Sequence, residues 1–456
     1  MSIVRTISEG FAWNAAATAV GKIVGFVNLF LIFSHLTIYE YGVTELTLSI
    51  VSLFGLFLLP GLSSIIAADL GVERAKKNFS GMRMIFREFF SVTVSLGVLA
   101  WAILFFGSSI VAHLTGNDLI DRLFNIASFL LITSPLRTAS SVLATSAVRF
   151  ADQSFFPVVE EIAKGVLLAI SFFVFNMTTD GLLLSAVGAQ IVAIILFAPR
   201  SLSAYREFNM APLIHERPLW NIIGEHRKWG IVAAYIGTAQ SSIRLFVLKL
   251  FLGTEAVGIY AFASGLFGQL AGLLPLGPVV GPLFPRYIDK PLEFARLLRA
   301  SIRLQLVIAL ALVVGSIALA PIFVEVFFEQ YSSAVLIFIL MVPALLPQSA
   351  IAIYTPVFRA LKEQRTQLSS AVFKFIIDVL VLPPLVIIAG LPGAGMHSLI
   401  VAGASAIERS IRLRRLFPEL SFSRNDIFHL DPLERKMIET LVARMRGMVR
   451  MHKEIL

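Results

Sequence analysis

Twelve apolar runs, each about as long as a membrane-crossing helix, constrain this chain more than any other feature. A helix needs roughly 20 apolar residues to cross a bilayer, so 456 residues leave room for about twelve crossings and no large soluble domain. A transmembrane strand needs only about ten alternating residues, so the runs predict helices. The runs cover residues 11–33, 43–67, 89–111, 123–147, 158–177, 182–198, 231–252, 256–276, 304–326, 334–358, 369–389 and 396–411.

The composition agrees with an integral, all-α membrane protein. Hydrophobic residues make up 57% of the chain and charged residues 15%, whereas about 25% of residues are charged in soluble domains. Cysteine is absent and the seven histidines show no metal-ligand spacing, so we expect no disulfide, metal or other cofactor. The first residues lack the cleavage site of a secretory signal, which predicts that the first run is retained as a helix.

Lys and Arg collect in alternate connections. Basic residues are dense in 74–87, 200–228 and 286–303, whereas the intervening connections carry almost none and Arg122 is the sole basic residue at an outer turn. Cytoplasmic loops are enriched in Lys and Arg. The alternation therefore predicts a multi-pass protein of the plasma (inner) membrane with both termini in the cytoplasm.

The chain also repeats itself weakly. Gly42 matches Gly258 at an offset of 216 residues, as do the pairs Arg83 with Arg299 and Arg87 with Arg303. Six helices separate the copies, and an even number preserves orientation in the membrane. We therefore expect two six-helix lobes related by a parallel pseudo-two-fold repeat around a central cavity.

This repeat predicts four segments: an N-terminal lobe (1–200), a basic cytoplasmic linker (201–229), a C-terminal lobe (230–411) and a basic tail (412–456). From Asp431 the tail has an N-cap pattern and an apolar residue at every fourth position. Such a helix would lie on the anionic inner leaflet, contact a partner or stay solvated.

Three cations fall inside the predicted spans, at Lys22, Arg137 and Arg244. A cation at bilayer depth costs at least ~2.5 to 3.5 kcal/mol, so we expect these side chains to face a wet cavity. Asn14 and Asn28 continue a polar stripe beside Lys22, and Gln240 lies one turn before Arg244; all three are candidate lining residues. A wet inner face lined by positive charge predicts an anion site.

Other interpretations of these residues stay open. Arg137 and Arg244 could instead cap carbonyls of kinked helices, and Lys249 could extend to the nearby outer surface, although it also remains a candidate lining residue. Lys374 and Asp378 are one turn apart, which predicts a local ion pair. A protonatable coupling site is the alternative reading of that pair.

Proline interrupts two corresponding helices. Pro60 falls in the second apolar run, and Pro275 and Pro278 fall in the proline-rich segment 273–287 at the end of the eighth. Proline removes a helical hydrogen bond and kinks or ends a helix. These three residues are candidate hinges, with a fixed bend as the alternative.

Several segments resemble the polysaccharide transport family, the O-antigen type lipid-linked oligosaccharide flippases of the multidrug/oligosaccharidyl-lipid/polysaccharide (MOP) exporter superfamily. The likeness is carried by "LFVLKLFLGTEAVGIYAFA", "PLFPRYIDKPLEFARLLRASIRL" and "RFADQSFFPVVEEIAKG". It implies alternating access that moves an undecaprenyl-pyrophosphate-linked oligosaccharide to the outer leaflet for cell-surface polysaccharide, such as lipopolysaccharide. The implied partners are this substrate, membrane lipid and polysaccharide assembly proteins, with no nucleic acid. Many relatives have Asp where this chain has Arg244, and Gly where it has Lys249, so a coupling role for that acid does not carry over.

Two other classes remain as alternatives. A cation-coupled multidrug or small-molecule exporter would need buried carboxylates, for which Asp378 is the main candidate. A membrane glycan polymerase or ligase would need catalytic groups in a sizeable outer loop, and every predicted outer connection is short. The sequence therefore predicts a transporter and not an enzyme.

Overall fold

A computed structural model describes residues 3–115, 119–147, 149–212, 228–274, 276–281, 283–288, 290–361 and 363–418. The predicted tail helix from Asp431 and most of the predicted linker lie outside these residues. Within them every regular element is a helix.

The first half of the chain folds into seven α-helices, and each predicted apolar run overlaps one or two of them. Their bounds are α1 (Ile3–His35), α2 (Ile38–Phe54), the 3-10 turn η1 (Gly55–Leu58), α3 (Leu62–Ala75), α4 (Phe79–Thr115), α5 (Leu119–Ser146), α6 (Phe150–Phe173) and α7 (Thr179–Arg206).

The second half repeats this plan. Its elements are α9 (Lys228–Leu252), α10 (Thr254–Ala271), α11 (Leu276–Val280), η3 (Phe284–Tyr287), α12 (Pro291–Phe327), η4 (Glu329–Tyr331), α13 (Ala334–Met341), η5 (Val342–Ala344), α14 (Leu345–Ala360) and α15 (Gln364–Leu416). Gly390, at φ 61° and ψ −142°, divides α15 into two helical segments, which match the last two predicted runs.

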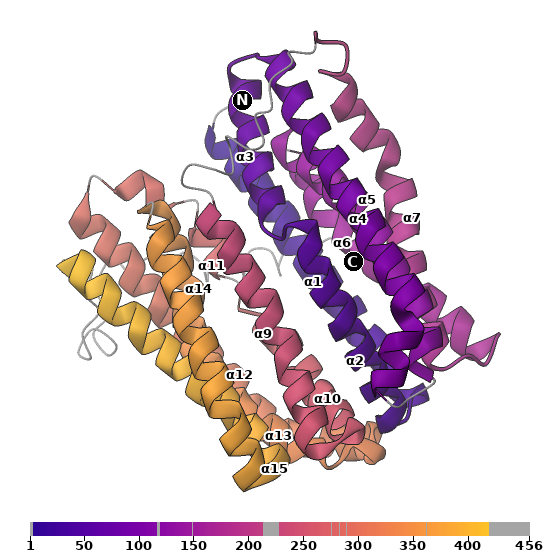
Figure 1. Cartoon of the computed structure of the whole chain (residues 1–456). Helices are drawn as coiled ribbons and strands as arrows, with labels where there is room; N and C mark the ends of the chain where they lie inside the picture. The colour runs from indigo at the N-terminus through magenta and orange to yellow at the C-terminus, as the bar shows by residue number, and fades with distance from the viewer. Residues whose placement is uncertain are drawn as a thin grey trace, which may run out of the picture.

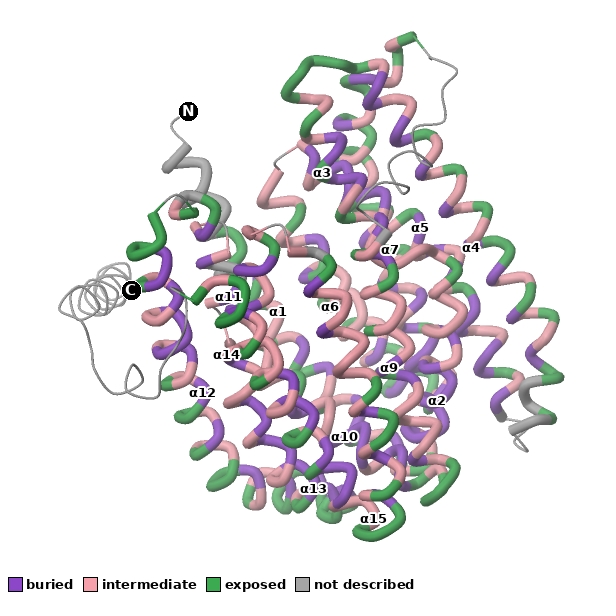
Figure 2. Tube along the Cα trace, turned by 60° about the vertical axis from the view of Figure 1, so that its left-hand side comes forward, coloured by how far each residue is buried: buried purple, intermediate pink, exposed green. Residues whose placement is uncertain are grey.

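Nine stretches of the described chain are long and apolar enough to cross a membrane. The stretch that contains α15 holds two of the predicted runs, and α6 and α10 are helices that fall outside the nine. Exposed positions recur along these helices (Figure 2). They include large apolar side chains such as Ile195, Leu380 and Ile388, as expected where lipid replaces water. The predicted all-α membrane fold is confirmed.

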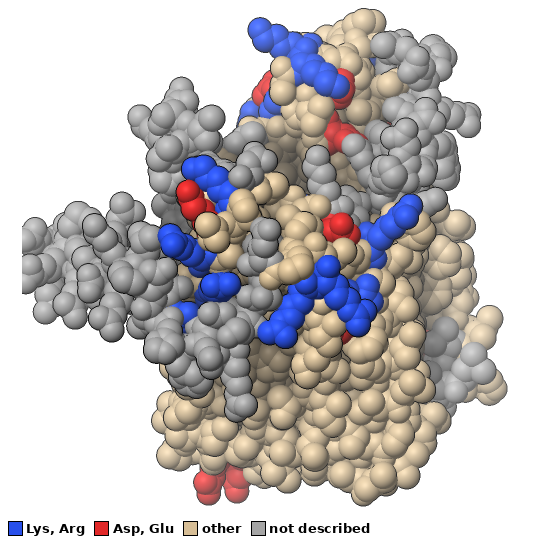
Figure 3. Space-filling view, turned by 90° about the vertical axis from the view of Figure 1, so that its left-hand side faces the viewer, with Lys and Arg blue, Asp and Glu red and all other residues tan. Residues whose placement is uncertain are grey.

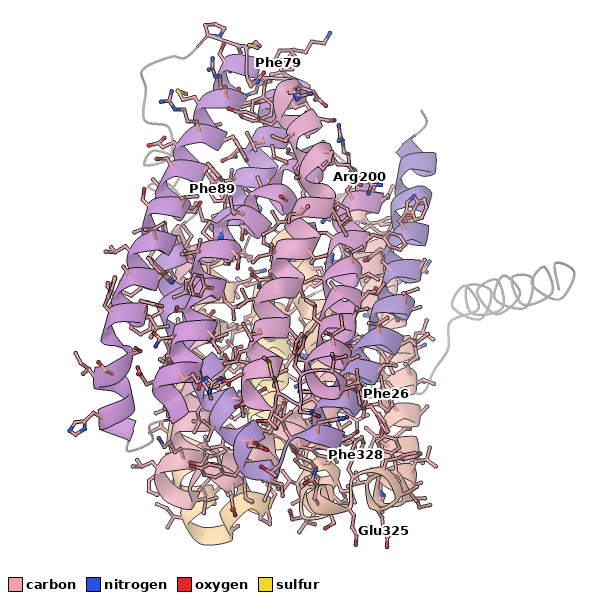
Figure 4. All side chains as sticks on the ribbon, turned by 90° about the vertical axis from the view of Figure 1, so that its right-hand side faces the viewer. Phe26, Phe79, Phe89, Arg200, Glu325 and Phe328 are labelled. Atoms are coloured by element: carbon pink, nitrogen blue, oxygen red, sulfur yellow. The ribbon has the colours of Figure 1, made fainter. Side chains whose placement is uncertain are left out.

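The helices form two lobes, α1 to α7 and α9 to α15, which lie apart at the end that holds the N-terminus and approach each other at the opposite end (Figure 1). On the face shown in Figure 3, Lys and Arg gather in the upper half, and the charged residues visible at the otherwise uncharged lower edge are acidic. Phe79 lies at the top and Glu325 at the bottom of Figure 4. We call the upper end the basic end and the lower end the closed end.

Two glycines hold the lobes together at the closed end, and their contact is reciprocal. A Cβ atom on Gly42 of α2 would lie 2.3 Å from the Thr254 carbonyl oxygen of α10, and a Cβ on Gly258 of α10 would lie 2.0 Å from the Ile38 carbonyl oxygen of α2. Both Gly258 and Thr254 lie 216 residues after their counterparts. The glycine match in the sequence is therefore a pseudo-two-fold contact, which only glycine permits at this helix separation.

Further contacts seal the closed end. The Gln330 amide donates to the carbonyl oxygens of Phe33 (2.9 Å) and Leu36 (3.2 Å), and the Tyr331 hydroxyl donates to Leu36 (3.1 Å). These are carbonyls at the C-terminal end of α1, where no helical partner remains. Burial and the nearby Glu40 carboxylate raise the pKa of Tyr331, so its hydroxyl keeps the proton that this bond requires.

Both predicted proline interruptions are present. Helix α2 gives way to η1, and Leu59 and Gly61, on either side of Pro60, have left-handed φ values of 54° and 89° before α3 begins. In the second half α10 ends at Ala271 and the short α11 follows, with Pro278 inside it, whereas Pro275 lies outside the described residues. Whether these breaks hinge stays a prediction.

Candidate functional site

A buried polar cluster joins α9 to both segments of α15. The Arg244 Nε donates to both carboxylate oxygens of Asp378, at 2.9 and 3.0 Å, and a terminal guanidinium nitrogen lies 2.7 Å from Asp378 Oδ1. His397 Nε2 lies 3.1 Å from the same oxygen. The side chains of Asp378 and His397 are 2% and 0% exposed. A carboxylate at this depth is tolerable because Arg244 compensates its charge.

This arrangement corrects one sequence interpretation. The sequence predicts a pair of Asp378 with Lys374 one turn earlier, but its ion pair in the described chain is with Arg244, and His397 Nε2 is its other close neighbour at 3.1 Å. Arg244 therefore donates to a carboxylate and not to kinked-helix carbonyls. Lys374 still interacts electrostatically with Arg244, Asp378 and the half-buried Arg409.

Lys22 bridges the two lobes. Its ammonium lies 3.2 Å from the Gln269 side-chain oxygen of α10 and donates to it. A Cβ atom built on Gly272, at the end of α10, would lie 2.0 Å from Lys22 Nζ, so the absence of a side chain there makes room for the ammonium. On its own lobe Lys22 interacts electrostatically with Glu161 of α6. The cation thus lies where α1 and α10 meet.

Arg137 lies on α5, inside the N-terminal lobe. Its Nε donates to Glu160 of α6 at 2.7 Å, and the arginine side chain is 41% exposed. Arg137 also lines a small cavity of about 70 Å³ between α5, α6 and α7, together with Arg149 and Arg200. Pro135 lies inside α5 two residues before Arg137, and the hydrogen bond that Arg137 makes is to the Glu160 carboxylate.

The three predicted cations therefore do not form one cluster. Lys22 and Arg137 lie on either side of the consecutive carboxylates Glu161 and Glu160, whereas Arg244 belongs to the separate cluster of the C-terminal lobe. Each cation has a partner that an incoming anion would have to displace or share.

The candidate lining residues have different environments. Asn28 is buried, and its side-chain amide nitrogen donates to the backbone oxygen of Glu161 (2.9 Å) and to the Glu161 carboxylate (2.8 Å). These bonds tie α1 to α6. Gln240 is 5% exposed, with its amide nitrogen unpaired within the described residues. Asn14 is exposed, and Lys249 lies in the last turn of α9, where it can reach the surface.

Sequence reasoning missed four members of this site. His397 was one of several scattered histidines, and Arg409 was hidden in the basic end of the last run. The fifth apolar run begins at residue 158, which places Glu160 and Glu161 near its start. Helix α6 instead begins at Phe150 and carries them into its middle. The acidic pair inside a helical run was the signal that could have found them. No group of metal-ligating side chains occurs in the described part of the chain.

Comparison with solved structures defines the fold class. An inward-facing multidrug resistance MATE family transporter of the MOP superfamily superposes with a TM-score of 0.71 at 14% identity, over 88% of this chain and 95% of that one. The lipid II flippase MurJ in an inward closed conformation gives 0.69 at 15%, over 97% and 99%. The Vibrio cholerae MATE transporter VcmN in the bent form gives 0.60 at 13%, over 90% and 100%. The chain has the fold of MOP-superfamily transporters.

The family follows from a sequence model described as "Polysaccharide biosynthesis protein", which matches residues 35–336. This chain therefore belongs to the polysaccharide biosynthesis protein family, as the resemblance implied. No curated protein matches it in sequence. The structural neighbours are transporters and a flippase, in agreement with the prediction that the chain is not an enzyme.

Proposed function

We propose that this protein is a flippase that moves an anionic lipid-linked oligosaccharide, of the undecaprenyl-pyrophosphate class, from the cytoplasmic to the outer leaflet of the plasma membrane. The observation that carries the proposal is Lys22, an intramembrane cation that reaches from one lobe to the other between α1 and α10. A pyrophosphate needs such compensation because desolvated charge is costly in the membrane. Membership of the polysaccharide biosynthesis family favours a glycan cargo.

The arrangement of the two lobes indicates the direction in which alternating access would move the cargo. The lobes are joined at the closed end and lie apart at the basic end (Figure 1), and basic connections favour the cytoplasm. The described conformation then faces the cytoplasm, both termini are cytoplasmic, and cargo enters beside Lys22. Rocking of the lobes about the closed end would release it outward.

The test is leaflet-resolved translocation of a fluorescent undecaprenyl-pyrophosphate oligosaccharide in proteoliposomes. We expect wild-type protein to move the lipid and Lys22→Ala to lose most of the rate while inserting normally. Arg137→Ala and Arg244→Ala should also reduce it, and Lys249→Ala serves as the matched control because that lysine lies in the last turn of α9. Full translocation by Lys22→Ala would contradict the cationic mechanism.

A cation-coupled exporter of small molecules is the second candidate, favoured by the buried Asp378 and His397 and by the MATE-like fold. In that case proteoliposomes would move a soluble cationic compound in exchange for protons and leave the lipid-linked oligosaccharide in its leaflet. The same vesicles, loaded with a pH-sensitive dye, distinguish the two outcomes.

A further inference from the structure

An apolar groove lies between the lobes and ends at the bridging lysine. It is a cavity of about 670 Å³, formed by α1 of the first lobe and by α10 and α12 of the second, within the roughly 300–1,000 Å³ of typical ligand sites. Its walls are apolar side chains that include Phe26, Val27, Leu266, Leu270 and Leu319, and Lys22 is its only charged lining residue among those described.

The groove faces the bilayer and not the water. Val27 and Leu319 are 51% and 65% exposed, and both belong to helices whose apolar surfaces have lengths suited to a membrane. Phe26, labelled in Figure 4, lies in the lower half of the molecule, and its ring centroid is 5.6 Å from the ring centroid of Phe323. Apolar walls offer water no hydrogen-bond partners, so hydrocarbon is the occupant that suits this groove.

The depth of Lys22 in the membrane indicates which kind of lipid can occupy the groove. It lies six residues inside the apolar stretch Ala16–His35, or ~9 Å along the helix axis from its start. The phosphate of an ordinary membrane phospholipid stays at the bilayer surface and does not reach this depth. A lipid whose phosphate enters the protein while its chain stays in the membrane can contact both Lys22 and the apolar walls of the groove.

We infer that the groove holds the long isoprenoid chain of the substrate lipid while Lys22 contacts its phosphate. This rests on the proposed function, since it assigns the place of that substrate's chain. Lipid is as apolar as the groove walls, so the chain gains no hydrophobic energy by entering. Binding there depends on shape and on the cation, which is why a side chain that fills the groove should abolish the preference.

Gly315 of α12 provides that substitution. It lines the groove, and a Cβ atom built on it meets no atom within 4 Å, so a side chain can start there without a clash at Cβ and the ring of Gly315→Phe would occupy the groove. Gly107 of α4 also has open space around it and lies outside the groove. Gly107→Phe is therefore the matched control for bulk and for the loss of a helix glycine.

The experiment measures binding of undecaprenyl phosphate to the detergent-solubilised protein by native mass spectrometry, with inorganic pyrophosphate as the chain-free probe. Gly315→Phe should weaken undecaprenyl phosphate binding by ~10-fold or more, in line with the loss of apolar fit in a pocket, and leave pyrophosphate binding unchanged. Lys22→Ala should weaken both, and Gly107→Phe neither.

Two results would overturn the inference: undecaprenyl phosphate binding that Gly315→Phe leaves intact, or equal competition by phosphatidylglycerol, which would make the groove a site for ordinary lipid. The proposed function fails differently. If the wild-type protein moves no lipid-linked oligosaccharide but binds undecaprenyl phosphate and Gly315→Phe weakens that binding, the groove inference is supported and the flippase proposal is refuted. If Gly315→Phe translocates normally and binds undecaprenyl phosphate as the wild type does, the flippase proposal is supported and the groove inference is refuted.

Discussion

The reciprocal glycine contact predicts that Gly42→Ala shifts the protein away from the described conformation. The new Cβ would lie 2.3 Å from the Thr254 carbonyl oxygen, and atoms in ordinary contact are ~3.5 Å apart, so α2 and α10 must separate by about 1 Å. Forcing an extra methyl group into a packed contact costs about 1–3 kcal/mol. In the proposed alternating access the lobes separate at this end and lose the contact, so the population ratio should change about 5- to 150-fold.

Spin-label distance measurements test this shift, and the absence of cysteine makes labelling simple. Thr178→Cys and Glu325→Cys place exposed labels near the closed end, one on each lobe, and Lys77→Cys with Lys290→Cys report on the basic end. In Gly42→Ala the first distance should lengthen and the second shorten.

Two comparisons make the result decisive. Gly258→Ala should produce the same shift, because it breaks the other half of the same contact, with a Cβ 2.0 Å from the Ile38 carbonyl oxygen. Gly107→Ala, which meets no atom, should leave both distances unchanged. If Gly42→Ala gives the wild-type distance distributions in a folded protein, the closed end does not depend on glycine packing and the reasoning is refuted.

Three further predictions follow from the polar contacts. Asp378→Asn should lower the melting temperature strongly, because loss of a buried partner leaves Arg244 uncompensated at a cost of about 3–5 kcal/mol; a double variant, Asp378→Leu with Arg244→Met, should melt above the single one, and an equal or lower value would argue against the pair. Gly272→Ala should displace the Lys22 ammonium and reduce translocation as Lys22→Ala does, with the charge intact; an unchanged rate would show that the position of the ammonium is unimportant. Lys249→Ala should retain most of the translocation rate, and a loss as large as that of Lys22→Ala would place Lys249 among the substrate-binding residues.

Local sequence patterns predicted the helices well. An apolar run of membrane length has few alternatives in lipid, because every backbone donor and acceptor must be paired within the helix, and each predicted run overlaps a helix of the structure. Errors fell where polar residues continue a helix, as at the start of α6, where the hydropathy pattern ends before the hydrogen bonding does. The repeat was also readable, since Gly42 and Gly258 keep the same role in both halves.

The partners of the intramembrane charges were decided by the tertiary structure alone. The sequence determined that Lys22, Arg137, Arg244 and Asp378 lie inside apolar runs, because composition fixes which residues enter the membrane. Proximity along the chain favoured Lys374 for Asp378, but the packing of α9 against α15 brings Arg244 to the carboxylate with better geometry. A buried charge takes the partner that its helix neighbours supply, and those neighbours are set by the crossing of the whole bundle and not by any single run.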